Sequence, residues 1–257
     1  MELKPYIKTR YRVMPSKRSD ANHWLGGEPY HRNANCPVCK RPLLLLWDIN
    51  CKDPRFRRGT FGSLTRLPLY YCWCCVNDIS YLVLSEDKIR IHPAKRSKDS
   101  FFQYEPYPTS FERRPISFYE GVPDEIRELV AKVNDDDFQP SAHQKKVLRE
   151  FFGHPITFGF GPTVVHHQLG GRPINHSWAE EVFECSNPEC SGKLADRLRG
   201  KKRAMRFLAG ILNDRWGGLP MVEPAGDETK QSWNFFVSAQ FHICDVCFTV
   251  TGANRCT

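Results

Sequence analysis

The residues best suited to chemistry in this sequence are its cysteines, of which there are 11 among 257 residues. Three pairs have the spacing C-x2-C and a fourth has C-x4-C. Two such pairs brought together by the fold supply four thiolates at the corners of a tetrahedron, which is the ligand set of a structural zinc ion. The spacing therefore predicts two structural zinc sites, the first formed by Cys36, Cys39, Cys72 and Cys75 and the second by Cys185, Cys190, Cys244 and Cys247.

Other interpretations of the cysteines stay open at this level. The odd number argues against a disulfide framework, but single buried, inert cysteines are common in protein cores. Cys51, Cys74 and Cys256 have no partner at metal-ligand spacing, and either His242 or Cys256 could replace a ligand in the second site. A hydrolase or redox enzyme that uses Cys74 or His23 is a third class. Because the sequence contains no H-E-x-x-H, G-x-S-x-G or P-loop motif, we expect no enzymatic activity.

The elements that must position the cysteine pairs occur twice along the chain. The motif H-x-L-G-G-x-P covers His23–Pro29 and again His167–Pro173, and a cysteine pair follows each copy. We expect both motif histidines to bond the adjacent turn rather than to act in catalysis. The repeated order indicates a duplicated unit, so we predict a mostly β (α+β), internally duplicated, two-lobed fold with one zinc site in each lobe. The predicted strands are Leu43–Asn50 and Leu67–Cys72 in the first half, and Met205–Asp214 and Ala239–Cys244 in the second.

Between the halves the pattern predicts a hairpin followed by helices. Ile79–Leu84 and Lys88–His92 have the composition of paired strands. Pro123–Asn134 begins with proline and acidic residues, and Ala142–Phe152 follows Ser141, which is a favourable N-cap. We therefore divide the chain into a first zinc-binding β lobe at residues 1–120, a helical connector at 121–155 and a second zinc-binding β lobe at 156–257.

A stretch rich in proline, aromatic residues and arginine, residues 93–119, belongs to neither copy of the repeat. Aromatic side chains beside arginines are typical of protein interfaces, so we predict that this stretch binds a partner protein. The alternative is that it clings to the surface and seals the core of one lobe. The predicted binding residues are Phe101, Phe102, Tyr104, Tyr107, Arg113 and Arg114.

The formal net charge of +8 arises entirely within residues 1–60. Such a surplus can indicate a polyanionic partner, and residues 193–206 form a second basic run. The alternative function is therefore a zinc-ribbon-type nucleic-acid-binding protein that uses these two regions. Four thiolates around zinc carry a net negative charge, which offsets part of the surplus and favours a protein partner. Since no apolar run could span a membrane and no secretory signal is recognisable, we expect a cytoplasmic protein without membrane contact.

The order of the motifs resembles the YwqG-type domain of unknown function and the related programmed cell death protein 2 family of eukaryotes. The resemblance implies a β-rich, internally duplicated fold and, for the eukaryotic relatives, a chaperone role that cradles a newly made ribosomal protein. This sequence departs from the bacterial type by keeping cysteine pairs in both halves, and from the eukaryotic type by its helical insert. We therefore expect a non-enzymatic, adaptor or chaperone-like protein that binds another protein. The resemblance is carried by Leu25–Pro29, Cys36–Leu46, Leu69–Cys75, Leu169–Pro173 and Phe241–Cys247.

Overall fold

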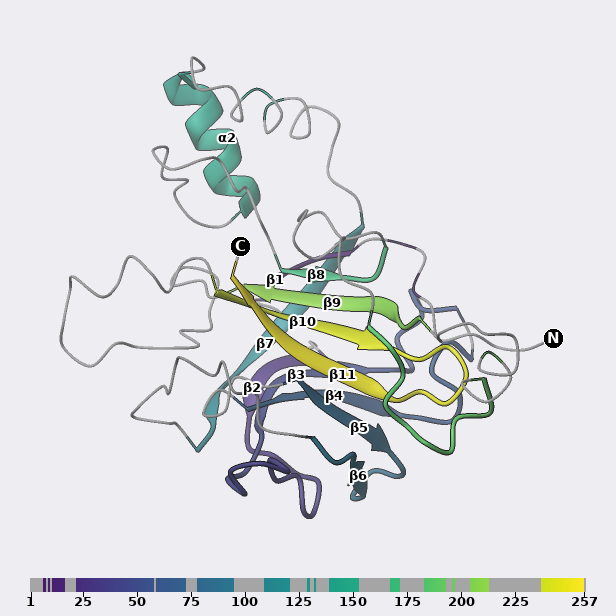
Figure 1. Ribbon diagram of the computed structural model, residues 1–257. Coiled ribbons are helices and arrows are strands. Elements are labelled where there is room, and N and C mark those ends of the chain that lie inside the picture. The colour runs from purple at the N-terminus through teal and green to yellow at the C-terminus, as the bar shows by residue number, and fades with distance from the viewer. Residues whose placement is uncertain are drawn as a thin grey trace.

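The computed structural model (Figure 1) consists mainly of β-strands. It describes residues 7, 9, 11–16, 22–57, 59–72, 78–94, 109–120, 129, 132, 139–152, 167–171, 183–192, 196, 204–212 and 237–256. Within these ranges the strands form one antiparallel sheet of 11 strands in the order β4-β3-β2-β7-β1-β8-β9-β10-β11-β5-β6. The strands are β1 Tyr11–Pro15, β2 His23–Gly27, β3 Leu44–Asn50, β4 Arg66–Tyr71, β5 Ile79–Val83, β6 Ile89–Ile91, β7 Phe111–Glu120, β8 Gln168–Leu169, β9 Arg206–Leu212, β10 Val237–Ile243 and β11 Val250–Cys256.

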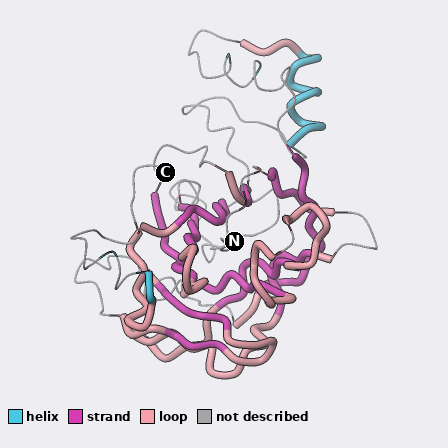
Figure 2. Tube along the Cα trace, turned by 90° about the vertical axis from the view of Figure 1, so that its right-hand side faces the viewer, coloured by secondary structure: helices cyan, strands magenta, loops and turns pink. Residues whose placement is uncertain are grey.

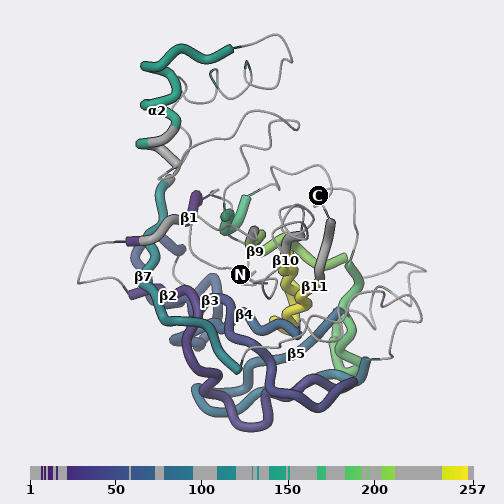
Figure 3. Tube along the Cα trace, turned by 90° about the vertical axis from the view of Figure 1, so that its left-hand side faces the viewer, coloured from purple at the N-terminus to yellow at the C-terminus, as the bar shows by residue number. Residues whose placement is uncertain are grey.

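The sheet is strongly curled, and its two ends approach each other, as the side views show (Figures 2 and 3). The strand β4 at one end contacts β5 and β11 near the other end. The fully buried Tyr81 of β5 bridges this seam, because its hydroxyl donates to the carbonyl of Pro68 at 2.8 Å and accepts from the backbone N–H of Tyr70 at 2.9 Å. Gly252 of β11 also lies against the backbone of β4, where a Cβ would meet the carbonyl oxygen of Tyr70 at 3.3 Å.

The main hydrophobic core fills the inside of this curl and takes side chains from both halves of the chain. Trp47 of β3 is fully buried there, and its ring meets that of His167 at 6.1 Å in an edge-to-face contact. A smaller apolar cluster surrounds Cys185 and Cys244 beside the second half of the sheet. Since strands of both halves share one sheet and one main core, the predicted division into two lobes is not confirmed.

The helix α2, Ala142–Phe152, stands away from the sheet in all three views (Figures 1, 2 and 3). Its N-terminus is capped by Ser141 as predicted: the Ser141 hydroxyl accepts from the N–H of Gln144 at 3.2 Å, and the Gln144 side chain accepts from the N–H of Ser141. The predicted helix Pro123–Asn134 lies almost entirely outside the described residues. Among the described residues, no helix has the length and apolar character needed to cross a membrane.

Most of the predicted strands are confirmed within a few residues, but five of the observed strands were not predicted. The predictions Leu43–Asn50, Leu67–Cys72, Met205–Asp214 and Ala239–Cys244 correspond to β3, β4, β9 and β10, and the predicted hairpin corresponds to β5 and β6. The strands β1, β2, β7, β8 and β11 are additional. Of these, β7 is a correction, because Phe111–Glu120 lies in the interior of the sheet between β2 and β1 rather than along its surface.

Candidate metal centres and the glycine-turn pocket

The second set of predicted ligands is brought together in full. The Sγ atoms of Cys185, Cys190, Cys244 and Cys247 all lie within 4.8 Å of one another. Two of the separations are 3.5 Å, between Cys185 and Cys247, and 3.7 Å, between Cys190 and Cys244. Ligands about 2.3 Å from a tetrahedral zinc ion would lie about 3.8 Å apart, whereas bonded sulfurs lie about 2.05 Å apart. The four thiols are therefore spaced as metal ligands and not as disulfides.

The first set is brought together as far as the structure describes it. The Sγ atoms of Cys36, Cys39 and Cys72 lie within 4.8 Å of one another, and those of Cys39 and Cys72 are 3.7 Å apart. The fourth predicted ligand, Cys75, lies outside the described residues. The two cysteine clusters could each bind a metal ion.

A C-x2-C knuckle with the same backbone geometry occurs in each cluster. The N–H of Cys36 bonds the carbonyl of Arg41, and the N–H of Cys244 bonds that of Thr249, both at 2.8 Å. Lys40 and Phe248, each directly after the second cysteine, donate to the carbonyl of the first cysteine and have φ values of 62–66°. Positive φ is uncommon for residues other than glycine. The same turn with positive φ occurs at both cysteine pairs. It holds the two sulfurs of each pair close together despite an unfavourable backbone conformation.

Contacts between sulfurs favour one ionised thiol in each cluster against the opposing effect of burial, whereas the pKa values of Cys185 and Cys244 are raised. Cys36, Cys72 and Cys244 are completely buried, and Cys39 and Cys247 are half-buried. Hydrogen bonds between sulfurs lower the pKa of Cys36 to about 5, chiefly through Cys72, and also lower the pKa of Cys247, chiefly through Cys185. The thiolate is the form of cysteine that binds metals. The donor set of each cluster therefore fits a thiophilic divalent cation such as zinc.

Of the two residues left open as replacement ligands, His242 does not belong to the described cluster, and Cys256 stays untested. The His242 ring stacks on Phe183 with centroids 4.3 Å apart, and the side chain of Cys256 is outside the described part. Cys51 lies apart from both clusters; its thiol contacts the carbonyl of Ile49, and burial raises the pKa of Cys51 to about 12. Cys51 is thus an inert core thiol, as its unpaired spacing predicted.

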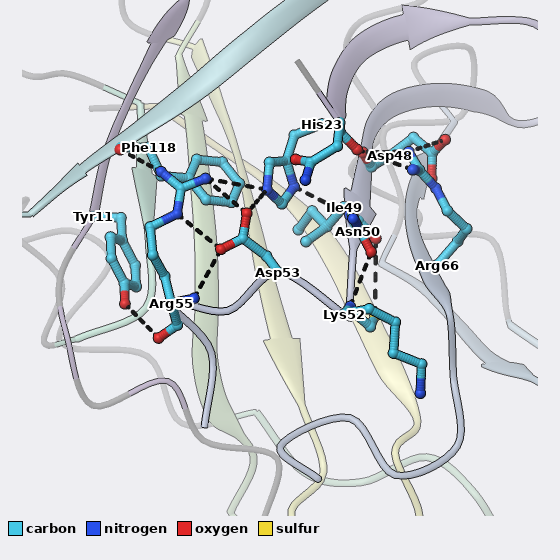
Figure 4. Close-up of polar contacts among 12 residues, drawn as sticks. Tyr11, His23, Asp48, Ile49, Asn50, Lys52, Asp53, Arg55, Arg66 and Phe118 are labelled. Carbon is cyan, nitrogen blue, oxygen red and sulfur yellow. Dashed lines mark hydrogen bonds and ion pairs between the residues drawn. The ribbon is translucent and has the colours of Figure 1, made fainter. Parts of the chain in front are cut away.

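His23, the first motif histidine, is bonded on both ring nitrogens in a buried network (Figure 4). Its Nδ1 accepts from the N–H of Asn50 at 3.1 Å, so Nε2 carries the proton and donates to Asp53 at 2.7 Å. Burial lowers the pKa of His23 to about 4, so the ring is neutral. Burial alone would raise the pKa of Asp53, but bonds from Arg55 and His23 hold it below its ordinary value. The predicted bond to the adjacent glycine turn is therefore a correction: the ring of His23 bonds the end of β3 and the loop after it instead.

Arg55 completes that network and is held by it. Its Nε and one terminal nitrogen donate to the two oxygens of Asp53 at 2.8 and 2.7 Å, and the other terminal nitrogen donates to the carbonyl of Phe118 at 2.6 Å. These bonds link the loop after β3 to the central strand β7. Arg55 belongs to the basic N-terminal region considered above for nucleic-acid binding, and these hydrogen bonds engage its guanidinium. No sequence pattern pointed to Asp53, which is an isolated acid in a loop.

A pocket of about 540 Å³ lies beside the first glycine turn. At Gly26 the φ is +67°, and a Cβ there would overlap the carbonyl oxygen of Glu112 on β7, so only glycine fits. Sequence reasoning identified this turn but not the pocket, whose acidic residues come from separate segments without a shared motif. The residues lining it are Gly26, Gly27, Glu28, Tyr30, Leu45, Asp48, Ser110, Phe111, Glu112 and Arg113.

Of the predicted binding residues, two are described and both are exposed on β7. Arg113 lines the pocket and places its guanidinium 4.1 Å from the centre of the Trp24 ring. Arg114 pairs with Glu112 at 2.7 Å. Phe101, Phe102, Tyr104 and Tyr107 lie outside the described residues, as do most of residues 193–206. The binding surface therefore stays a prediction.

Comparison with known proteins identified no relative of this chain. No protein-family model, no curated protein and no solved structure matches it. The assignment of function consequently depends on the geometry of the chain itself.

Proposed function

We propose that this protein is a non-enzymatic, zinc-dependent protein-interaction module, adaptor-like or chaperone-like, built from a duplicated unit. The observation that carries the proposal is the second cysteine cluster, in which four thiols from two distant segments have the mutual spacing of tetrahedral ligands. A closed four-thiolate site leaves no coordination position for substrate. The zinc ions therefore stabilise the fold, and function is exerted at a binding surface.

The strand order supports the duplication. The pair β7–β1 stands at a centre, with β2, β3 and β4 following on one side and β8, β9 and β10 on the other. The strands that follow the motif strands, β3 and β9, thus occupy equivalent places in the sheet. The same is true of β4 and β10, which lead to the second cysteine pair of each half. If the second repeat unit is counted from β7 rather than from residue 156, each unit pairs its first strand with the other unit, since β1 pairs with β8 and β7 pairs with β2.

The two glycine turns support it as well. Both glycines of each motif have positive φ, between 67° and 107°. A Cβ at Gly26 would overlap the backbone of β7, and a Cβ at Gly170 would overlap Ile7, just before β1. The same pair of glycines therefore accommodates the incoming first strand in both halves. An internally duplicated unit explains why the motif and its geometry occur twice.

Metal analysis of protein purified without added zinc tests the first part of the proposal. We expect about two zinc ions per chain, about one in Cys36→Ser or Cys244→Ser, and about two in the matched control Cys51→Ser. Because structural zinc contributes directly to folding, the first two variants should also lose solubility. Less than about one zinc per chain in the unmodified protein would overturn the proposal.

Recovery of a partner from native lysate tests the second part. We expect Phe102→Ala/Tyr104→Ala to lower partner recovery while the zinc content and the melting temperature stay unchanged. Leu84→Ala, which alters an apolar side chain that is exposed in the described part of the chain, serves as the control. Unfolding of the double variant would instead indicate that the aromatic residues of the stretch 93–119 are part of the core. If Lys201→Glu/Lys202→Glu/Arg203→Glu abolished copurifying nucleic acid, and binding fell steeply with salt, the nucleic-acid-binding alternative would replace the proposal.

A further inference from the structure

The pocket beside the first glycine turn has the size of a ligand site and is formed by three segments of the chain. Its volume of about 540 Å³ falls within the range of pockets that bind small ligands or single side chains. Leu45 of β3 is buried at its base, and Phe111 of β7 is half-buried. A concave site with an apolar base and several converging polar groups is a typical binding pocket.

The pocket wall contains an exposed aromatic ring. Tyr30 is 38% exposed, which makes it one of three large apolar side chains exposed in the described part of the chain. Its hydroxyl donates to Asp48 at 3.1 Å, and its ring lies beside that of His31 with centroids 4.5 Å apart. The ring is therefore fixed in place while one side of it stays accessible. A fixed aromatic face of this kind attracts a cation.

Carboxylates predominate among the charged groups that line the pocket. Asp48 is buried and firmly held, because Arg66 donates to its two oxygens at 2.9 and 2.6 Å. In the part of the chain that the structure describes, Glu112 pairs with Arg114, and the two side chains are 73% and 45% exposed. An exposed pair of this kind contributes little to stability, so Glu112 can exchange its partner for a ligand. Glu28 is exposed and accepts a hydrogen bond from Ser110.

The arginine that lines the pocket directs its charge elsewhere. The stem of Arg113 runs along Gly27, where a Cβ would meet its Cγ at 3.6 Å, and its guanidinium lies over Trp24, which is not part of the lining. The pocket is therefore lined by two exposed acidic residues, Glu28 and Glu112, by the ring of Tyr30 and by the apolar residues Leu45 and Phe111. That combination matches an aliphatic stem that ends in a cation.

We propose that this pocket receives a lysine or arginine side chain from a basic segment of the partner protein. The inference rests on the proposed protein-binding function and specifies the chemistry of the partner. The apolar stem of the incoming side chain packs on Leu45 and Tyr30, and its cationic end lies between Glu28 and Glu112. A phosphate-bearing partner would be repelled by the same carboxylates.

Fluorescence titration with short labelled peptides tests the proposal on the zinc-loaded protein. The probe is a repeat of Gly-Arg-Gly-Ser, compared with a repeat in which citrulline, the neutral isostere of arginine, replaces arginine. We expect the arginine peptide to bind at least about tenfold more tightly. Glu28→Gln and Glu112→Gln should each weaken binding about threefold, and the double variant about tenfold. Glu86→Gln removes an exposed carboxylate outside the pocket lining and should leave binding unchanged.

Equal affinity for the arginine and citrulline peptides would overturn the proposal, as would unchanged binding in the double variant. Tighter binding of free spermidine than of the peptide would also overturn it, because the cation would then come from a small molecule. Both glutamates are exposed, so these variants should keep the melting temperature of the unmodified protein. Recovery of the partner separates this inference from the proposed function. If the unmodified protein recovers no partner, the function is wrong; if Glu28→Gln/Glu112→Gln recovers it undiminished, only the pocket is wrong.

Discussion

Replacing His23 by glutamine should remove a pH dependence of stability that the buried network creates. His23 is 1% exposed and neutral, since its Nδ1 accepts from Asn50 and its Nε2–H donates to Asp53. Burial lowers its pKa to about 4 in the folded protein, against an ordinary value of 6.5. Between these two values the unfolded chain binds a proton that the folded protein does not. The free energy of unfolding therefore falls as the pH falls from 6.5 towards 4.

The size of the effect follows from the two pKa values. For one group with these values, the free energy of unfolding at pH of about 5.5 is lower than at pH of about 7.5 by about 1.3 kcal/mol. His31 is also buried with a lowered pKa, and thiolates bind metal less well in acid, so the unmodified protein loses more than this amount. These other losses are common to the unmodified protein and His23→Gln. The difference between their two pH dependences isolates the contribution of His23.

Urea unfolding of both proteins at several pH values between about 5.5 and about 7.5 measures that difference. We expect His23→Gln to be less stable at neutral pH, because the amide oxygen and nitrogen of glutamine do not occupy the positions from which the two ring nitrogens bond Asn50 and Asp53. We also expect it to lose about 1.3 kcal/mol less on acidification. Parallel curves for the two proteins would refute the reasoning, because they would mean that His23 titrates alike in the folded and unfolded states.

Three further perturbations test other parts of the fold. Tyr81→Phe removes two hydrogen bonds at the seam and leaves the N–H of Tyr70 buried without its partner, so the free energy of unfolding should fall by about 2 kcal/mol in urea titrations. Gly26→Ala introduces a Cβ that overlaps β7 at positive φ and should cost at least about 2 kcal/mol, whereas Gly62→Ala, with its nearest contact at 3.6 Å, should cost less; melting temperatures compare the two. Removal of metal with a chelator should lower the melting temperature and, if the second cluster binds zinc, should abolish any difference in melting temperature between the unmodified protein and Cys244→Ser.

The sequence was sufficient to predict elements whose patterns are local. The apolar strands β3, β4, β9 and β10 and the cap at Ser141 follow from hydrophobic runs and a favourable N-cap. The cysteine spacings likewise predicted which thiols would come together, and seven of the eight predicted ligands fall into the two clusters. The eighth, Cys75, lies outside the described residues and stays a prediction.

The strands that sequence reasoning missed depend on long-range packing. In β7, Pro115 and the exposed charged residues 112–114 gave the pattern of a surface segment, yet Pro115 pairs with Trp24 inside the sheet. The strand β11 contains Gly252, where glycine is needed because Phe241 and the backbone of β4 approach closely. The acidic residues of the glycine-turn pocket also come together only through the pairing of β2 with β7. No local sequence pattern indicates such long-range contacts.

The exchange of first strands between the halves has a consequence for how the chain folds during synthesis. The strand β1 leaves the ribosome first, yet its partners are β7 and β8, and the N–H of Val13 bonds the carbonyl of His167, more than half of the chain away. Neither half can complete its part of the sheet until the other has been made. Folding should therefore be slow and late, as expected where contacts are far apart in sequence. A chain interrupted in its second half would leave β1 and the apolar face of β2–β4 exposed to aggregation.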